Sequence, residues 1–357
     1  MTTLVLHIGS PKAGSSTIQA SFGAARWDRH WCALPANPYG KPYPSGLIAG
    51  LYLEPKAFPR FLAQRQHQDP DRFNRDLECY RHLLRQALRP RWRARPQGAV
   101  LSCEYLWRLP PDGLCRLRAD LQGWGVTRFV VVAYVREPVS LFGSALQQWA
   151  RLSTDLHRFD PSRWRYELRQ RLETWAAVFP GDLVVRPYDR VQLRHGCVVA
   201  DLQDQLRQRL TDLPALPELK AVSAVNRASS SEELVAMQEL MLRQPGGDGR
   251  TTSERARALT RLWEMLEQQV QQKGTPIQVR PAVKALIRRR HQEDLDWLTA
   301  HYGVHLPEPS ASHARGSELS GPIDQICTLP GLLEDCGQPE LLEALRARLS
   351  EVRLPSA

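Results

Sequence analysis

Two short apolar runs stand out from a chain in which apolar residues otherwise recur at the three- and four-residue spacing of helices. The runs are Thr3–Ile8 (TLVLHI) and Val126–Val135 (VTRFVVVAYV). Apolar runs of this length that contain β-branched residues predict buried strands. Each run leads into a segment of helix-forming residues, so the pattern predicts the order strand, loop and helix twice. We therefore expect an α/β fold, in which a parallel β-sheet is flanked by helices.

Helical patterns fill much of the remaining sequence. They predict helices over Asp71–Leu88, Arg163–Phe179, Val198–Leu210, Ser253–Gln271, Pro281–Tyr302 and Pro339–Val352. Ser230 and Glu233 have the spacing of a capping box, which predicts a further helix that ends at Leu242.

Segments rich in proline, glycine or serine divide the chain. Ala33–Pro59 also contains several aromatic residues and predicts a long irregular loop, which we expect to shape an acceptor pocket. Pro307–Pro322 has the composition of a linker. The expected organisation is one α/β domain over residues 1–305, with the irregular insert at 33–60. A linker and a helical C-terminal extension follow at 306–357.

The loop after the first strand has the residues of an anion site. It lies within His7–Thr17 (HIGSPKAGSST), where Gly14 lets the main chain approach a ligand and Lys12 supplies a positive charge. The amide groups that begin the following helix have no partners within it, and the helix dipole adds positive charge. Three hydroxyl donors begin that helix: Ser15, Ser16 and Thr17. The loop is therefore expected to bind phosphate or sulfate.

A second stretch is expected at the same edge of the sheet. Pro138 suits the first turn of a helix, so Arg136 should lie at the carboxyl end of the strand Val126–Val135. Ser144 then lies about two turns into the helix. Because ligands bind at the carboxyl ends of strands in open parallel sheets, both stretches should face one crevice.

These stretches resemble the cofactor motifs of sulfotransferases that use 3′-phosphoadenosine 5′-phosphosulfate (PAPS). Pro11–Ser16 (PKAGSS) is similar to the family's P-K-[ST]-G-[ST]-[ST] loop, which holds the 5′-phosphosulfate on a P-loop-like fold. Ala13 departs from that pattern and lacks the usual hydroxyl. Arg136, Pro138 and Ser144 stand at the spacing of the family's R-x-P motif and its following serine, which hold the 3′-phosphate.

Three weaker similarities extend the resemblance over about residues 1–234. Ala99–Trp107 (AVLSCEYLW) resembles a strand that ends in serine and glutamate, which would place Glu104 at the crevice. Asp182–Arg190 resembles the next strand, and Val225–Leu234 resembles an asparagine- and serine-rich segment of bacterial relatives. The resemblance implies that two residues of this last segment complete the nucleotide site: Asn226 and Arg227.

The resemblance implies transfer of a sulfuryl group from PAPS to a hydroxyl or amine by in-line displacement. Lys12 and the amides of residues 14–17 would neutralise charge on the leaving phosphate. The base that takes the acceptor's proton is Glu104 or His7, and we prefer Glu104 because His7 lies within the first strand run. The sulfuryl group carries less charge than a terminal phosphoryl group, and the sequence has no zinc-ligand spacing, so we expect no metal.

Other functions remain open at the level of sequence. An ATP-dependent kinase would normally carry G-K-[ST], whereas here Lys12 precedes Gly14. A non-catalytic protein that binds a nucleotide or a partner is a second alternative. Arg89–Pro96 (RPRWRARP) interleaves arginine with tryptophan as a nucleic-acid surface does, but its prolines favour an exposed linker.

Composition limits the class of protein and the compartment. The net charge of +10 favours an anionic partner, such as PAPS or an acidic carbohydrate acceptor, and is equally typical of a solvated basic surface. No apolar run approaches the roughly 20 residues that span a bilayer. The seven cysteines form no C-x-x-C pair, which favours reduced thiols. We therefore expect a cytoplasmic protein, and the sequence leaves its oligomeric state open.

Overall fold

The computed structural model divides into two compact units. It describes residues 2–35, 46–88, 96–221, 229–244, 253–269, 273–308 and 322–354. The first unit contains Met1–Arg136, Glu167–Val225 and Asp294–Leu306. The second unit contains Glu137–Tyr166, Asn226–Glu293 and Pro307–Ala357.

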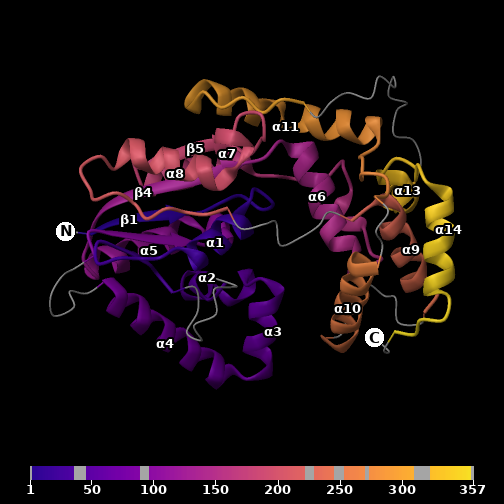
Figure 1. Ribbon diagram of the computed structural model, residues 1–357, viewed down its shortest axis with the longest axis horizontal. Helices are drawn as coiled ribbons and strands as arrows, with labels where there is room; N and C mark the ends of the chain where they lie inside the picture. The colour runs from indigo at the N-terminus through magenta and orange to yellow at the C-terminus, as the bar shows by residue number, and fades with distance from the viewer. Residues whose placement is uncertain are drawn as a thin grey trace. The chain divides into compact units, whose positions relative to one another are not determined.

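A parallel sheet of five strands forms the centre of the first unit (Figure 1). Its strands are β1 (Thr2–His7), β2 (Trp31–Ala33), β3 (Gly98–Ser102), β4 (Val126–Val135) and β5 (Leu183–Pro187). The order is β2-β3-β1-β4-β5, and all neighbouring strands are parallel. Every residue of β1 is buried, as expected for an inner strand covered on both faces. The expected α/β class with a parallel sheet is confirmed.

Helices cover the sheet of the first unit. They are α1 (Ser15–Ala24), α2 (Leu47–Tyr52), α3 (Arg60–Gln68), α4 (Pro70–Leu88), α5 (Pro111–Gly123), α7 (Leu168–Val178) and α8 (Val198–Arg209). Val5 of β1 and Val132 of β4 share an apolar cluster with Ile18 of α1 and Leu202 of α8. Phe129, on the same strand as Val132 but an odd number of residues away, packs edge-on against Phe179 after α7.

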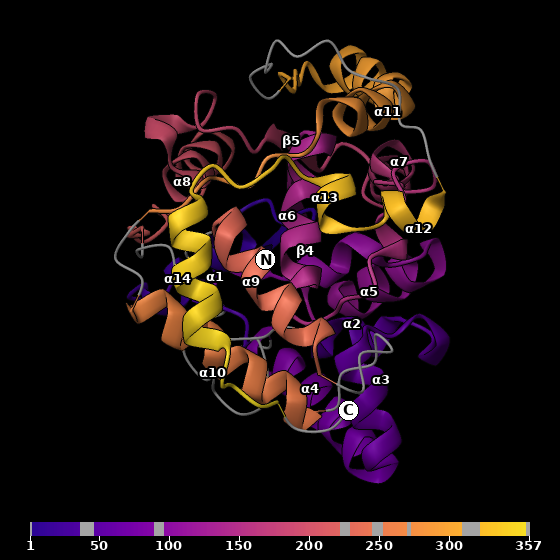
Figure 2. The same ribbon diagram turned by 90° about the vertical axis from the view of Figure 1, so that its right-hand side faces the viewer.

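The second unit is helical. Its elements are α6 (Pro138–Ala150), α9 (Ser231–Leu242), α10 (Ser253–Gln269), part of α11 (Pro281–Tyr302), α12 (Ile323–Ile326), α13 (Leu329–Leu332) and α14 (Pro339–Leu349). Helices α9 and α14 lie side by side (Figures 1 and 2). The predicted capping box of α9 is confirmed, because Ser230 Oγ accepts from Glu233 N and the Glu233 carboxylate accepts from Ser230 N.

The sequence-based division at residue 305 differs from the observed units. The C-terminal helix α14 is not a separate extension, because its Leu341 and Leu345 belong to the same apolar cluster as Leu234 and Met237 of α9. Phe142 of α6 lies in that cluster too. Apolar faces that are distant in sequence therefore form one core, which the composition of the intervening linker does not reveal.

The predicted irregular loop Ala33–Pro59 is partly helical. Residues 36–45 lie outside the described residues, but α2 occupies Leu47–Tyr52 and is mostly buried. Gly50 permits this packing, since a Cβ there would lie 3.1 Å from Leu77 Cδ2. The Tyr52 hydroxyl also donates to Asp120 Oδ2 at 3.0 Å. Tertiary contacts with α4 and α5 thus form a helix where proline and glycine predict none.

Helix α7 starts five residues later than predicted from Arg163. Asp160 Oδ1 accepts from the amide and the hydroxyl of Ser162, which holds a turn at the expected helix start. Glu167 then adopts a left-handed conformation with φ of 56°, so the helix can begin only at Leu168.

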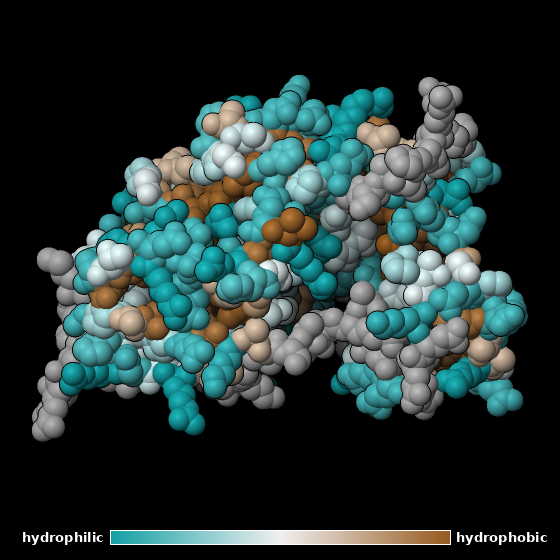
Figure 3. Space-filling view, turned by 45° about the horizontal axis from the view of Figure 1, so that its top comes forward, coloured by the Kyte–Doolittle hydropathy of each residue, from teal (hydrophilic) through white to brown (hydrophobic). Residues whose placement is uncertain are grey.

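Further expectations concern the cysteines, membrane-spanning segments and the linker Arg89–Pro96. All seven cysteines are free thiols, and Cys103 and Cys327 are buried while Cys79 and Cys115 are exposed. No helix in the described ranges is both long and apolar enough for a membrane span. On the face in Figure 3, hydrophilic residues dominate and apolar residues form separate areas. The predicted linker Arg89–Pro96 lies outside the described residues, apart from its last residue.

Candidate functional site

The loop between β1 and α1 is held against β4 by its own backbone. Ile8 N donates to Val132 O at 3.0 Å, and Ser10 N donates to Tyr134 O at 3.1 Å. Ala13 N then donates to Ser10 O at 3.3 Å, which closes a turn within the loop. These bonds fix the main chain before any ligand binds, as a preorganised anion site requires.

Two residues of this loop adopt left-handed backbone conformations. Gly14 has φ of 81°, and a Cβ there would lie 2.6 Å from Tyr188 Cε2, so conformation and close approach both require glycine. Lys12 has φ of 62°, which costs a non-glycine residue about 1 kcal/mol. Backbone strain of this kind is concentrated at ligand sites, where surrounding bonds hold it in place.

The burial of Ala13 accounts for an alanine where the resembled loop has serine or threonine. Its side chain is fully buried and packs in the apolar cluster that also contains Val5 and Val198. A hydroxyl at this position would therefore enter the core, where it would need a partner. The alanine removes no donor from the exposed side of the loop.

Helix α1 begins at the loop and supplies the expected donors. Gly14, which precedes the helix, provides no side-chain cap. Thr17 N donates to Gly14 O at 3.1 Å, so the first-turn amides without a place in the helix's own hydrogen bonds are those of Ser15 and Ser16. Ser16 is exposed and Thr17 is half-buried, whereas Ser15 is only 4% exposed. Ser15 Oγ has no hydrogen-bond partner among the described residues. Amides, hydroxyls and the Lys12 charge together give this loop the chemistry of an oxyanion site.

Arg136 comes to the same loop from the end of β4. Its Nη1 donates to the carbonyl oxygen of Lys12 at 3.0 Å. Its guanidinium lies 5.9 Å from the centre of the Tyr188 ring, which follows β5. The ends of β1, β4 and β5 therefore meet at one edge of the sheet, where the Arg136 guanidinium contacts the main chain of Lys12.

The sequence predicted three further residues at the nucleotide: Ser144, Asn226 and Arg227. Ser144 is half-buried on α6 in the second unit, about two turns from Pro138 as predicted. Asn226 and Arg227 lie outside the described residues.

Glu104 lies where β3 leaves the sheet. It opens a short 3₁₀ helix, Glu104–Arg108, directly after Cys103. Burial raises the pKa of its carboxyl, while the charges of Lys12 and Arg108 act in the opposite direction. Glu104 is thus near enough to Lys12 to interact with its charge, and a carboxylate of raised pKa is a better proton acceptor.

His7 is the last residue of β1 and has no exposed surface. Its Nδ1 lies 2.7 Å from Ser102 Oγ, so the ring is hydrogen-bonded to a side chain of the neighbouring strand. Burial lowers the pKa of His7 to about 3, which keeps the imidazole neutral. His7 thus has no accessible surface, whereas Glu104 is half-buried.

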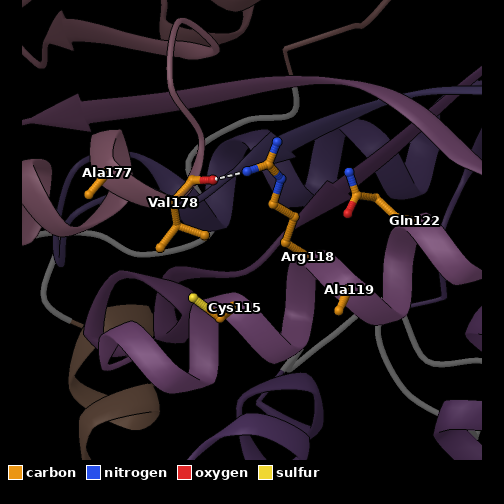
Figure 4. Close-up of a pocket in the computed structure, with 6 residues that line it drawn as sticks. All are labelled: Cys115, Arg118, Ala119, Gln122, Ala177 and Val178. Carbon is orange, nitrogen blue, oxygen red and sulfur yellow. Dashed lines mark hydrogen bonds between the residues drawn. The ribbon is translucent and has the colours of Figure 1, made fainter.

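A separate open pocket of about 400 Å³ lies between α5 and α7 (Figure 4). Arg118 Nη1 donates to the carbonyl oxygen of Val178 at 2.6 Å across it. The pocket is at the carboxyl ends of both helices, which in a parallel α/β sheet lie beside the amino ends of the strands. It is therefore at the sheet edge opposite to the anion loop.

No family model, no curated protein and no solved structure matches this chain. Within the described ranges, no three histidine, cysteine, aspartate or glutamate side chains gather in a way that could hold a metal ion.

Sequence reasoning missed the partners of His7 and Gly14. Ser102 faces His7 because the two residues are paired between β3 and β1, and this register cannot be read from either strand alone. Tyr188 packs on Gly14 from beyond β5. The only sequence signals were the serine that ends β3 and the tyrosine within Asp182–Arg190.

Proposed function

We propose that this protein transfers the sulfuryl group of PAPS to a hydroxyl or amine acceptor. The observation that carries the proposal is the hydrogen bond from Arg136 to the Lys12 carbonyl, which joins the two cofactor motifs at one sheet edge. The residues fit a phosphosulfate, because the loop presents amides, hydroxyls and the Lys12 charge, and Arg136 contacts the loop from the end of β4. The chain's resemblance to PAPS-dependent sulfotransferases supports the same choice of ligand.

PAPS, when bound, supplies the activated sulfuryl group and a phosphate leaving group. Lys12 and the first amides of α1 then neutralise charge on an oxyanion held at the loop. Removing one such donor typically costs on the order of 10²–10³ in rate. Arg136 supplies a second positive charge from β4, which suits a ligand that carries a further phosphate.

Glu104 is proposed to accept the acceptor's proton. Its raised pKa brings the carboxylate nearer to the operating pH, where a general base contributes about 10²–10⁴-fold. The charge of Lys12 nearby acts against that rise in pKa.

The acceptor is proposed to be a carbohydrate. The net charge of +10 favours acidic glycans over neutral ones by raising their local concentration. The free state of all seven thiols is consistent with action in the cytoplasm.

The proposal is tested by calorimetric titration with 3′-phosphoadenosine 5′-phosphate, with ATP·Mg²⁺ as comparator. We expect micromolar binding of the bisphosphate and at least about tenfold weaker binding in Lys12→Ala and Arg136→Ala, a loss of about 1.4 kcal/mol. Arg128→Ala is the matched control, because it removes the same charge from an exposed ion pair with Asp212 at the start of β4. It should bind as the parent protein does.

Other outcomes would overturn the proposal. Preference for ATP·Mg²⁺ would favour a kinase, and binding of neither nucleotide would favour a non-catalytic protein. Once an acceptor is known, Glu104→Gln should bind the bisphosphate normally and lose turnover. Full turnover in this variant would exclude Glu104 as the base.

A further inference from the structure

Two buried polar atoms lie beneath the anion loop without hydrogen-bond partners among the described residues. They are His7 Nε2 and Ser15 Oγ. Both residues are nearly or fully buried, with exposed fractions of 0% and 4%. A buried polar atom without a hydrogen bond destabilises the folded state, so two of them at one site require an explanation.

Both atoms lie next to the α-carbon of Gly9. A Cβ on Gly9 would lie 2.5 Å from Ser15 Oγ and 3.0 Å from His7 Nε2. Any side chain at position 9 would therefore intrude between the imidazole and the serine hydroxyl. Because Gly9 has no side chain, His7 at the end of β1 and Ser15 at the start of α1 can face each other.

The hydrogen bond at the other ring nitrogen limits what Nε2 can do. A neutral imidazole has one donor nitrogen and one acceptor nitrogen. If Ser102 donates its hydroxyl proton to Nδ1, the ring proton lies on Nε2 and is directed toward Ser15. In the other tautomer Nε2 is an acceptor, and Ser15 would turn its own proton inward.

Only the first arrangement suits an anion. With Nε2–H donating to Ser15 Oγ, the Ser15 proton is left to point at the ligand. In the other tautomer, Ser15 donates its proton to Nε2, so it would present lone pairs to an oxyanion and repel it. A row of hydrogen bonds that all donate in one direction also strengthens each member by polarisation.

We propose that His7 is a positioning residue for the anion loop, which receives a hydrogen bond from Ser102 and donates one to Ser15, so that the Ser15 hydroxyl donates to a bound oxyanion. This inference rests on the proposed function, because it assumes that the loop binds the nucleotide's phosphosulfate. It requires the Ser15 side chain to turn toward Nε2 when the ligand binds. No covalent step or proton transfer is involved.

A double-mutant cycle on affinity for 3′-phosphoadenosine 5′-phosphate tests the coupling. His7→Asn keeps an amide near Ser102 but removes the group at Nε2, and Ser15→Ala removes the hydroxyl. Each change should weaken binding about tenfold, and the double variant should bind no worse than Ser15→Ala alone. His82→Asn replaces an exposed histidine and should bind as the parent does.

The outcomes separate the two proposals. If the parent protein does not bind the bisphosphate, the proposed function fails and the role of His7 fails with it. If the parent binds the bisphosphate, two results show that only the positioning role is wrong. Either His7→Asn alone leaves the affinity unchanged, or adding it to Ser15→Ala weakens binding by a further tenfold.

A measurement on the unsubstituted protein guards against misfolded variants. Nitrogen-15 NMR of histidine-labelled protein distinguishes protonated from bare ring nitrogens. The His7 ring can be assigned through its proximity to the Tyr134 ring, whose centre is 6.0 Å away. We expect a protonated Nε2 and a bare Nδ1 when the bisphosphate is bound. The reverse tautomer would overturn the proposal.

Discussion

Lowering the pH from 7 to 5 should destabilise the first unit through His7. In the unfolded chain this histidine takes up a proton near its ordinary pKa of 6.5, whereas in the folded unit burial holds the pKa at about 3. The unfolded state therefore binds more protons as the pH falls, so the stability present above pH 6.5 is progressively lost down to about pH 3. Between pH 7 and 5 the loss is about 2 kcal/mol.

Hydrogen exchange of the β1 amides measures this loss, because β1 is the middle strand and its exchange reports opening of the sheet. The opening free energy should fall by about 2 kcal/mol more in the parent than in His7→Asn. Carboxyl groups with shifted pKa values, such as Glu104, titrate in both proteins and cancel in the comparison. His82→Asn should keep the parent's pH dependence. An equal loss in the parent and in His7→Asn would refute the reasoning.

Two further substitutions probe the site and its support. Gly14→Ala should lower the thermal midpoint more than Gly181→Ala: both have positive φ, at a cost of about 1–2 kcal/mol, but only Gly14 also meets the Tyr188 ring. Equal shifts would mean that the ring moves aside freely. Asp201→Asn should cost about 3 kcal/mol in unfolding experiments, because it leaves Arg186 without its buried partner. The exposed pair of Asp212 is the control, and Asp212→Asn should change the midpoint little.

Much of the fold could be predicted because its signals are local. Val126–Val135 and Pro281–Tyr302 have the predicted bounds, since a mostly apolar run rich in valine and a long helical pattern with an initial proline are both distinct signals. Helix α2 could not be predicted, because its stability comes from packing on α4 rather than from its own six residues.

Part of the candidate site could likewise be predicted from the sequence, and part could not. That Arg136 should approach the loop of Lys12 follows from general rules for parallel sheets. The environment of His7 depends on the pairing of β1 with β3, and its pKa depends on burial by residues from several elements. Sequence reasoning could name this histidine as chemically important, but only the register shows that it faces Ser102 and not solvent.

The position of β1 in the sheet has a consequence for how the chain folds. Thr3 pairs with Gly98 on one side and with Arg128 on the other, so every ladder bond of this strand joins residues far apart in sequence. Such pairing pays loop-closure entropy before it gains contacts, and it makes folding slow. During synthesis, one side of this apolar strand stays unpaired until β3 has left the ribosome, and the other side until β4 has. That interval is when β1 is most exposed to aggregation, and chaperones that hold apolar strands should increase the yield of folded protein.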